Sequence, residues 1–291
     1  MNYKSNKNQE NKDYEMLEKT ELDVNFYENK NRRINKIKSI QKKSKYSKIT
    51  NKKTSEIIAI SGYFGTGKTI ISSLLSKYIS FQNKKVLLID FNLENEALNV
   101  LFGVKKYKEK NNKFDIENYI LNINKNLNII TGISDLFKFN INYSLENFKL
   151  NLRKLKTKYD YIIFDTSSRI DLKYVKLVLA NSNKIIFLIE PNLLEIAKAN
   201  SMIEVILKDW NINIDKIKIV FNKANKNKII DSIVEEIFSE FEILGNIKYN
   251  EEYNLFINKN TNIEINYTEI NEIYSKIKKE ERYANSSVRS Y

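Results

Sequence analysis

Residues 62–69 read GYFGTGKT, which fits the pattern G-x-x-x-x-G-K-T over its whole length. The apolar run Ile57–Ile60 precedes this stretch, and helical periodicity begins at Lys68. A loop between a buried strand and a helix N-terminus presents backbone N–H groups that bind phosphate oxygens, and glycines let these groups converge. Three of the six glycines of the chain lie here, which disfavours a chance glycine-rich turn. The stretch therefore predicts a phosphate-binding loop.

The composition narrows the chemistry that this chain can perform. Its 291 residues include neither cysteine nor histidine, which excludes disulfides, thiolate metal sites, and catalysis by thiol or imidazole. Any reaction would depend on carboxylates, lysines and a bound cation. A hydrophobic fraction of 42% is enough for a sizeable core. The N-terminus is polar and no apolar run is long enough to span a membrane, so we expect a cytoplasmic protein.

Positive charge is concentrated near the N-terminus. The net charge is +13, and residues 30–53 contain 11 Lys or Arg and no acidic residue. Residues 1–55 lack sustained periodicity and are predicted to form a disordered or loosely helical arm. Its basic segment 30–53 fits contact with nucleic acid or with an anionic membrane. A solvated tail without a partner is the alternative.

Strands and helices alternate from residue 56 to 280, and residues 281–291 are predicted to form a C-terminal tail. This alternation predicts an α/β P-loop domain with a mostly parallel, twisted sheet of about seven strands and helices on both faces. We expect strands at Ile57–Ser61, Val86–Asp90, Leu127–Thr131, Tyr161–Asp165, Lys184–Glu190, Lys216–Phe221 and Ile243–Ile247. We expect helices at Lys68–Phe81, Leu145–Lys156, Leu172–Ala180, Leu193–Asp209, Ile229–Phe241 and Tyr267–Ile277. The last helix carries an apolar stripe that fits packing on the sheet or, alternatively, binding to a membrane.

Two of the predicted strands end in an aspartate. Asp90 follows Val86–Ile89, and Asp165 follows Tyr161–Phe164. In open α/β sheets, ligands bind at this carboxyl edge. We expect Asp165 to hold Mg²⁺ through water, as a Walker B carboxylate does, together with the hydroxyl of Thr69. Asp90 is expected to serve the reaction, and capping of the following helix is the alternative for both aspartates.

The order of the motifs resembles the ParA/MinD family of deviant Walker A ATPases, and most of all its CpaE/TadZ branch, over about residues 55–280. The segment Ser61–Thr69 is similar to the family's S-G-K-G-G-V-G-K-T, and Tyr159–Thr166 is similar to its Y-D-Y-I-I-x-D-T. Further similarities are found at Val86–Asp90 (second acidic motif), Phe187–Glu195 (strand and loop), Ile219–Lys223 (V-x-N-R/K) and Ile243–Ile247 (V-L-G-x-I-P).

The resemblance implies ATP and Mg²⁺ as cofactors. It implies contact of Lys68 with phosphate, a metal site of Thr69 and Asp165, and recognition of adenine by Asn222. A plain loop asparagine is the alternative for Asn222. Catalytic residues are then Lys68 and Asp90, and the cofactor-binding residues are Gly62, Gly65, Thr66, Gly67, Lys68, Thr69, Ile70 and Asn222.

Two positions depart from the family pattern. Tyr63 occupies the position of the signature lysine, and Asn92 replaces the second aspartate of the D-x-D motif. Asparagine cannot act as a carboxylate base, and loss of a cationic group can slow phosphoryl transfer on the order of 10³-fold. The phosphate cradle is mainly backbone, so we expect ATP binding with slow or absent hydrolysis.

The resemblance implies a protein that forms a homodimer in the ATP state. In the CpaE/TadZ branch this implies positioning or assembly of a pilus or secretion apparatus, in the cytoplasm or peripherally at a membrane. The alternative is a plasmid or chromosome partition ATPase at the nucleoid, which binds non-specific DNA, and the basic arm favours it. A metabolic kinase is disfavoured because no second substrate pocket is recognisable in the sequence.

Overall fold

The computed structural model describes residues 55–105, 116–131, 145–224, 228–253 and 267–286. The predicted N-terminal arm, apart from Ser55, lies outside these residues, as do its basic segment 30–53 and the end of the predicted C-terminal tail. Among the described residues, no helix is both long enough and apolar enough to span a membrane.

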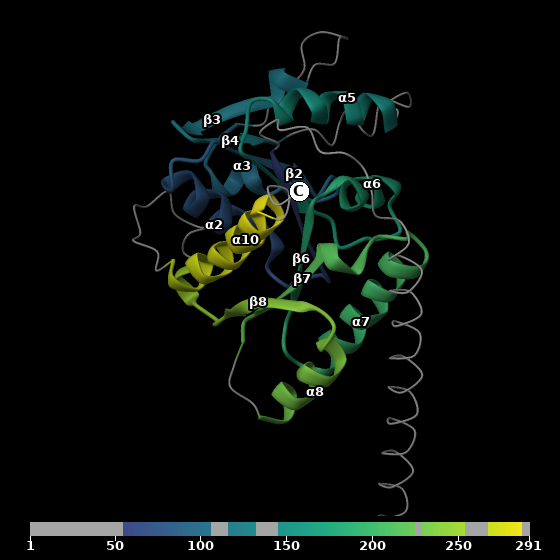
Figure 1. Cartoon of the computed structure of the whole chain (residues 1–291). Coiled ribbons are helices and arrows are strands. Elements are labelled where there is room, and N and C mark those ends of the chain that lie inside the picture. Colours follow the sequence, from purple (N-terminus) through teal and green to yellow (C-terminus); the bar gives the residue numbers. More distant parts are fainter. Residues whose placement is uncertain (1–54, 106–115, 132–144, 225–227, 254–266, 287–291) are drawn as a thin grey trace, which may run out of the picture. The chain divides into compact units, whose positions relative to one another are not determined.

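The described part of the chain is built around one eight-stranded sheet with the order β3-β4-β2-β5-β1-β6-β7-β8 (Figure 1). All neighbouring strands are parallel except β3 and β4. This confirms the predicted α/β P-loop fold. The strands are β1 Glu56–Gly62, β2 Val86–Phe91, β3 Ile120–Asn124, β4 Leu127–Ile130, β5 Tyr161–Thr166, β6 Lys184–Ile189, β7 Ile217–Asn222 and β8 Glu242–Ile247.

Strand β3 is absent from the sequence prediction. It lies at the edge of the sheet, pairs only with β4 and is only partly buried. An edge strand has one neighbour and needs no continuous apolar run, so asparagines interrupt its sequence. The Asn124 side chain accepts hydrogen bonds from the backbone N–H groups of Asn126 and Leu127, both at 2.9 Å, which forms the turn into β4.

Helices cover both faces of the sheet (Figure 1). On one face, Ile58 of β1 shares the hydrophobic core with Leu74 of helix α2. On the other face, Phe148 of helix α5 contacts Phe91 of β2 and Phe164 of β5, with ring centroids 6.0 and 6.2 Å apart. Because both faces are covered, β1, β2, β5, β6 and β7 are buried along their whole length or nearly so.

The helices follow the predicted order. Helices α2 (Lys68–Phe81) and α5 (Leu145–Lys156) have the predicted bounds. Those of α6 (Lys173–Asn181), α7 (Leu193–Lys208) and α8 (Lys228–Phe238) differ from the prediction by a few residues at one or both ends. The structure adds three short elements that have too few residues for a periodic pattern: α3 (Leu98–Leu101) and the 3₁₀ helices η2 (Ile116–Tyr119) and η3 (Ile214–Lys216).

The last helix, α10 (Thr268–Ser286), extends beyond the predicted bounds into the stretch predicted as a tail. Its apolar stripe is buried in the core at Ile270, Ile273, Tyr274 and Ile277. Tyr274 contacts Tyr78 of α2, with ring centroids 5.8 Å apart. The stripe therefore packs on the sheet and α2, and it is not free to bind a membrane.

The strand order determines where the predicted site residues meet. Strand β1 lies between β5 and β6. Asp165 is in register with Ile60 of β1 on one side and with Asp90 of β2 on the other. Because these strands are parallel, both aspartates and the end of β1 lie at the same carboxyl edge of the sheet.

Candidate nucleotide-binding site

The predicted phosphate-binding loop joins β1 to α2 and depends on glycine at two close approaches. Gly62 has a φ of 143°, and a Cβ there would lie 2.5 Å from the Leu188 carbonyl oxygen of β6. Gly67 has a φ of 85°, and a Cβ there would lie 2.5 Å from Nδ2 of Asn222. A larger residue would strain the backbone and displace its neighbours. The ends of β6 and β7 therefore define the path of the loop.

Helix α2 begins without a side-chain cap. Its N-cap residue, Gly67, has left-handed backbone dihedral angles, and the first turn contains no acidic residue. The N–H groups of the first turn, including those of Thr69 and Ile70, have no partner within the helix. Together with the helix dipole, such N–H groups bind phosphate. This geometry is compatible with the predicted roles of Thr69 and Ile70.

The ammonium group of Lys68 is buried at the loop. It donates hydrogen bonds to the carbonyl oxygens of Gly62 (3.2 Å) and Tyr63 (2.9 Å) and to the hydroxyl of Ser168 (2.6 Å). Burial lowers the pKa of Lys68 to about 8, and the nearby carboxylate of Asp165 opposes this change. A bound phosphate would offer stronger, charged acceptors in place of these neutral oxygens.

The carboxylate of Asp165 is buried at the end of β5, and neither of its oxygens has a hydrogen-bond partner of normal geometry among the described residues. Burial raises its pKa to about 6, although the Thr69 hydroxyl and the Lys68 ammonium lie close enough to oppose the rise. A buried carboxylate without a partner is costly unless a cation compensates it. Oxygen ligands suit Mg²⁺, so Asp165 and Thr69 fit the predicted metal site.

Among the described residues there is no cluster of three or more acidic side chains that could hold a metal ion by itself. A Mg²⁺ ion here would therefore take its remaining ligands from water and from nucleotide phosphates. This is the usual arrangement for Mg²⁺ in phosphate-transferring sites.

Asp90 makes the contacts that the capping alternative predicts. Its Oδ2 accepts hydrogen bonds from the backbone N–H groups of Ala97 and Leu98, both at 2.9 Å, at the start of α3. Burial and, to a smaller extent, the negative charge of Asp165 raise the pKa of Asp90 to about 8, although these N–H bonds oppose the rise. Asp90 therefore lies beside Asp165, but one of its carboxyl oxygens is bound to the N-terminus of α3. A catalytic role for Asp90 stays a prediction.

Asn222 is part of the site, although in a different way from the predicted adenine contact. Its Nδ2 donates a hydrogen bond to the Thr66 carbonyl oxygen at 2.8 Å. The Thr66 hydroxyl in turn donates to the Tyr63 carbonyl oxygen at 2.9 Å. Asn222 therefore supports the loop backbone, and recognition of adenine stays a prediction.

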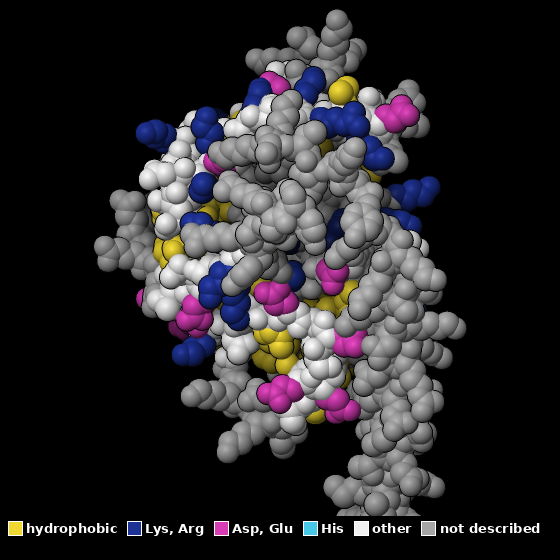
Figure 2. All heavy atoms as spheres, in the orientation of Figure 1, with side chains coloured by type: hydrophobic (Ala, Val, Ile, Leu, Met, Phe, Trp, Pro, Cys, Tyr) yellow, Lys and Arg dark blue, Asp and Glu magenta, His cyan; other side chains and the backbone are white. Residues whose placement is uncertain are grey.

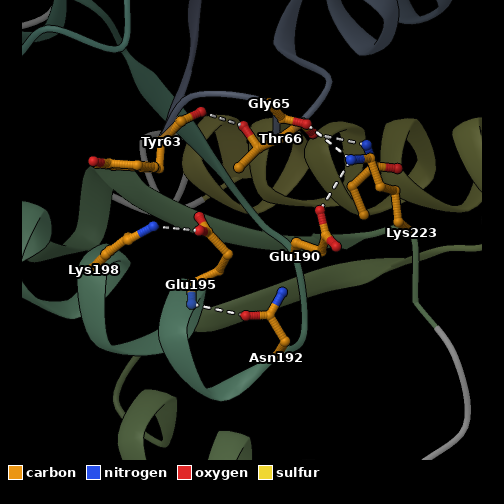
Figure 3. A network of polar contacts seen from close by, with 9 residues as sticks. Tyr63, Gly65, Thr66, Glu190, Asn192, Glu195, Lys198 and Lys223 are labelled. Carbon is orange, nitrogen blue, oxygen red and sulfur yellow. Dashed lines mark hydrogen bonds and ion pairs between the residues drawn. The ribbon is translucent and has the colours of Figure 1, made fainter.

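The rim of the site carries a cation that the sequence did not reveal (Figure 3). The ammonium group of Lys198, from α7, lies 4.5 Å from the ring centroid of Tyr63. It also donates to Glu195 at 2.8 Å, which raises the pKa of Lys198. Tyr63 itself carries no charge, so the positive charge beside it comes from α7.

The loops after β2 and β5 are joined beside the site. Glu94, two residues after Asn92, forms an ion pair with Arg169 at 2.9 Å. The Ser167 hydroxyl donates to Glu94 at 3.3 Å, and the next residue, Ser168, contacts Lys68. Sequence reasoning missed Ser168, Glu94, Arg169 and Lys198, because single polar residues in loops have no pattern that distinguishes them.

The curled loop, the uncapped α2 and the buried Lys68 and Asp165 define a P-loop nucleotide-binding protein. Residues 57–263 match the model of the CobQ/CobB/MinD/ParA nucleotide binding domain, so the chain belongs to this family. No curated protein sequence matches the chain.

Three solved structures illustrate the likeness. A Borrelia burgdorferi B31 protein, described as a plasmid partition protein and bound to AMPPNP, has 25% identity and a TM-score of 0.63, over 77% of this chain and 97% of its own. The MinD cell division protein of Aquifex aeolicus has 20% identity and a TM-score of 0.62, over 77% and 96%. Apo McdA from Cyanthece has 17% identity and a TM-score of 0.63, over 77% and 98%. The last two support the fold alone.

The capping contacts of Asp90 lead to a prediction. Asp90→Ala should lower the free energy of unfolding by about 2 kcal/mol, because two buried N–H groups lose their acceptor. Asp90→Asn keeps an acceptor oxygen and resembles the protonated carboxyl, which predominates at pH 7 when the pKa is about 8. It should therefore retain most of the stability. Urea denaturation at pH 7 measures both variants, and equal losses would contradict the capping role.

Proposed function

We propose that the protein binds ATP with Mg²⁺ and dimerises in the ATP state, and that it positions or assembles a cellular apparatus with slow or absent hydrolysis. The observation that carries this proposal is the phosphate-binding loop at residues 62–69. Here uncapped N–H groups of α2 lie beside Lys68 and a buried Asp165 that lacks a hydrogen-bond partner of normal geometry. This fold is shared by proteins described as a plasmid partition protein, as the cell division protein MinD and as McdA.

The proposed roles follow the contacts in the site. The N–H groups of the loop and of Thr69 and Ile70 bind the phosphates, and Lys68 bonds to the β/γ-phosphates. The Thr69 hydroxyl is a direct Mg²⁺ ligand, and Asp165 holds a metal-bound water. When bound, Mg²⁺ supplies charge neutralisation on the phosphate oxygens. One solved structure of this fold, MinD from Pyrococcus horikoshii OT3, is described as complexed with Mg-ADP.

Slow hydrolysis is proposed because two groups that support phosphoryl transfer are missing. Asn92 lies in the turn after β2, where its carbonyl oxygen accepts from Asn95 at 3.0 Å, and its amide cannot act as a base. Tyr63 carries no positive charge. Lys198 lies over its ring, but the charge of Lys198 is offset by Glu195. Binding depends mainly on the backbone and is retained.

Exposed apolar side chains support the proposed dimer. Phe64, in the loop, is 77% exposed, and Leu193 and Leu194, at the start of α7, are 59% and 64% exposed. The Tyr63–Lys198 contact joins the loop to the first turns of α7, so these side chains belong to one region beside the nucleotide site. Exposed apolar groups gathered in this way favour a protein interface.

The finer assignment is to the CpaE/TadZ branch, with a partner protein in a pilus or secretion apparatus and a place in the cytoplasm or at the membrane periphery. It rests on the motif resemblance between residues 55 and 280. Among solved structures of this fold, MinD of Aquifex aeolicus is described in a complex with MinC. By analogy with that complex, this chain is proposed to bind a protein partner.

Nucleotide should control the oligomeric state. We expect the full chain to be monomeric with Mg-ADP and dimeric with Mg-ATP in analytical ultracentrifugation, because a γ-phosphate can contact a second chain only in the dimer. Lys68→Ala should weaken ATP binding at least about tenfold and abolish the shift. Lys77→Ala, at a partly buried lysine of the same helix, is the matched control. The same sedimentation coefficient with Mg-ADP and with Mg-ATP would contradict the proposed switch.

Turnover should be slow and recoverable. The wild-type rate of Mg-ATP hydrolysis should lie well below about 1 s⁻¹, which is the lower end of the usual range of kcat for enzymes. The double substitution Tyr63→Lys and Asn92→Asp restores both missing groups and should raise the rate by at least about tenfold. A phosphate-release assay on the two purified proteins measures this. Fast turnover by wild type would show that residues 63 and 92 do not limit the reaction.

A second candidate function is that of a partition ATPase that binds DNA. It is favoured by two basic clefts near the amino ends of the strands, at the end of the sheet opposite the nucleotide site. One cleft is lined by Lys149, Arg153 and Lys156, with Leu152 and Asn181. The other is lined by Lys85, Lys125 and Lys158, with Asn122, Asn126, Asn128, Thr157 and Tyr159. Figure 2 shows more basic than acidic side chains around α5 and β3. Lysines and asparagines are donors for DNA phosphates.

DNA binding would be recognised by its salt dependence. If these clefts bind DNA, replacing Lys149, Arg153 and Lys156 by Ala should reduce the slope of log K against log salt by about 2 to 3, because each phosphate contact contributes about 0.9. Fluorescence anisotropy with random duplex measures the slope, and a chain beginning at residue 55 separates the clefts from the basic arm. An unchanged slope in the triple variant would assign DNA binding to other residues.

A further inference from the structure

Asn222, the last residue of β7, and Lys223, which follows it, bind two successive carbonyl groups of the phosphate-binding loop. Asn222 donates to the Thr66 carbonyl oxygen at 2.8 Å, and Lys223 donates from Nζ to the Gly65 carbonyl oxygen at 3.0 Å. Figure 3 shows Gly65 and Thr66 above Lys223 and Glu190. The donors therefore come from outside the loop and its helix, from a strand more than 150 residues later in the chain.

Holding a carbonyl group also orients the N–H group of the same peptide. In a trans peptide the C=O and the following N–H point in opposite directions within one plane. The Gly65 carbonyl belongs to the same peptide as the N–H of Thr66, and the Thr66 carbonyl to the same peptide as the N–H of Gly67. With both carbonyls bound to β7, these two N–H groups point away from β7.

Both the side chain of Lys223 and the backbone around it are held by neighbouring strand ends. Its Nζ also forms an ion pair with Glu190, just after β6, at 3.0 Å. Its backbone has a φ of 58°, the left-handed region that side-chain-bearing residues seldom adopt. The next residue, Ala224, donates to the Ile247 carbonyl oxygen at 2.9 Å. β6, β7 and β8 therefore all contribute to the place of this ammonium group.

Stability alone gives no reason for a lysine here. The Lys223–Glu190 pair is partly exposed, with 37% and 35% of the side chains accessible, and such pairs contribute little to folding. A lysine in the left-handed region is disfavoured relative to glycine. A glycine at this position would lose this weak ion pair and, with it, the hydrogen bond to the Gly65 carbonyl oxygen.

We propose that Lys223 is a positioning residue for the phosphate cradle, because it fixes the Gly65–Thr66 peptide so that the Thr66 N–H faces the nucleotide phosphates. Glu190 assists by holding the Lys223 ammonium group. The inference rests on the proposed binding of ATP. The loop's own residues make the phosphate contacts, and Lys223 orients the loop backbone from the end of another strand.

The test separates positioning from folding with Lys223→Gly in the full chain. Glycine accepts a φ of 58° without strain, so the thermal melting temperature should be equal to or above that of wild type. The dissociation constant for Mg-ATP, measured by calorimetry, should rise about tenfold, because a charge-assisted hydrogen bond to the loop is lost. Mg-ADP, which also carries the β-phosphate, should lose a similar factor.

Further variants complete the test. Lys223→Met keeps the length of the side chain without a donor and should bind as weakly as Lys223→Gly, whereas Lys223→Arg should restore most of the affinity. Lys208→Ala is the matched control, because Lys208 also forms a partly exposed ion pair, with Glu204 at 2.9 Å. Wild-type affinity in both Lys223→Gly and Lys223→Met would overturn the positioning role. If wild type itself binds no Mg-ATP, the proposed function fails, and this inference fails with it.

Discussion

The close fit of the loop at residues 62–69 against the ends of β6 and β7 is the constraint on which the rest of the site depends. Gly62 approaches the Leu188 carbonyl, and Gly67 approaches Asn222, at distances that leave no room for a Cβ atom. The loop can therefore curl tightly over the centre of the sheet. Its curl places the start of α2, with unpaired N–H groups, above the carboxyl ends of the strands.

The second feature of the site is a group of buried ionisable side chains. Asp90 and Asp165 are neighbours in register, and burial raises the pKa of both carboxyls. Lys68 is the nearby cation, and burial lowers its pKa. A charged Asp165 or Lys68 is costly here without a ligand, since burial has removed the water around it. A magnesium nucleotide would supply a cation for Asp165 and anionic oxygens for Lys68. Its binding would therefore offset the free-energy cost of burying these groups.

Two cations at the rim of the site come from outside the loop. In the loop itself Tyr63 carries no charge, and Lys198 of α7 lies over its ring. Lys198 is paired with Glu195, and Lys223 is paired with Glu190. Cations held by carboxylates can orient groups but neutralise little additional charge.

The sequence predicted most of the fold because its buried strands are continuous apolar runs and its main helices have clear periodicity. Edge strand β3 and the short α3 were missed, since a partly buried strand and a four-residue helix carry no such pattern. The loop, Lys68 and Asp165 were identified because a local motif places them on a strand or at a helix start. For Asp90, the sequence left capping and chemistry as alternatives.

Which side chains surround that loop was decided only by the tertiary structure. Lys198 and Lys223 follow it by more than 100 residues, and the strand order brings them to it. Lys198 has no sequence pattern of its own, and the motif that ends at Lys223 does not indicate its contact with the loop. The sequence by itself determined the phosphate-binding loop, because that information is local. The tertiary structure decided which residues support the loop, because contacts between distant segments depend on how the strands are ordered in the sheet.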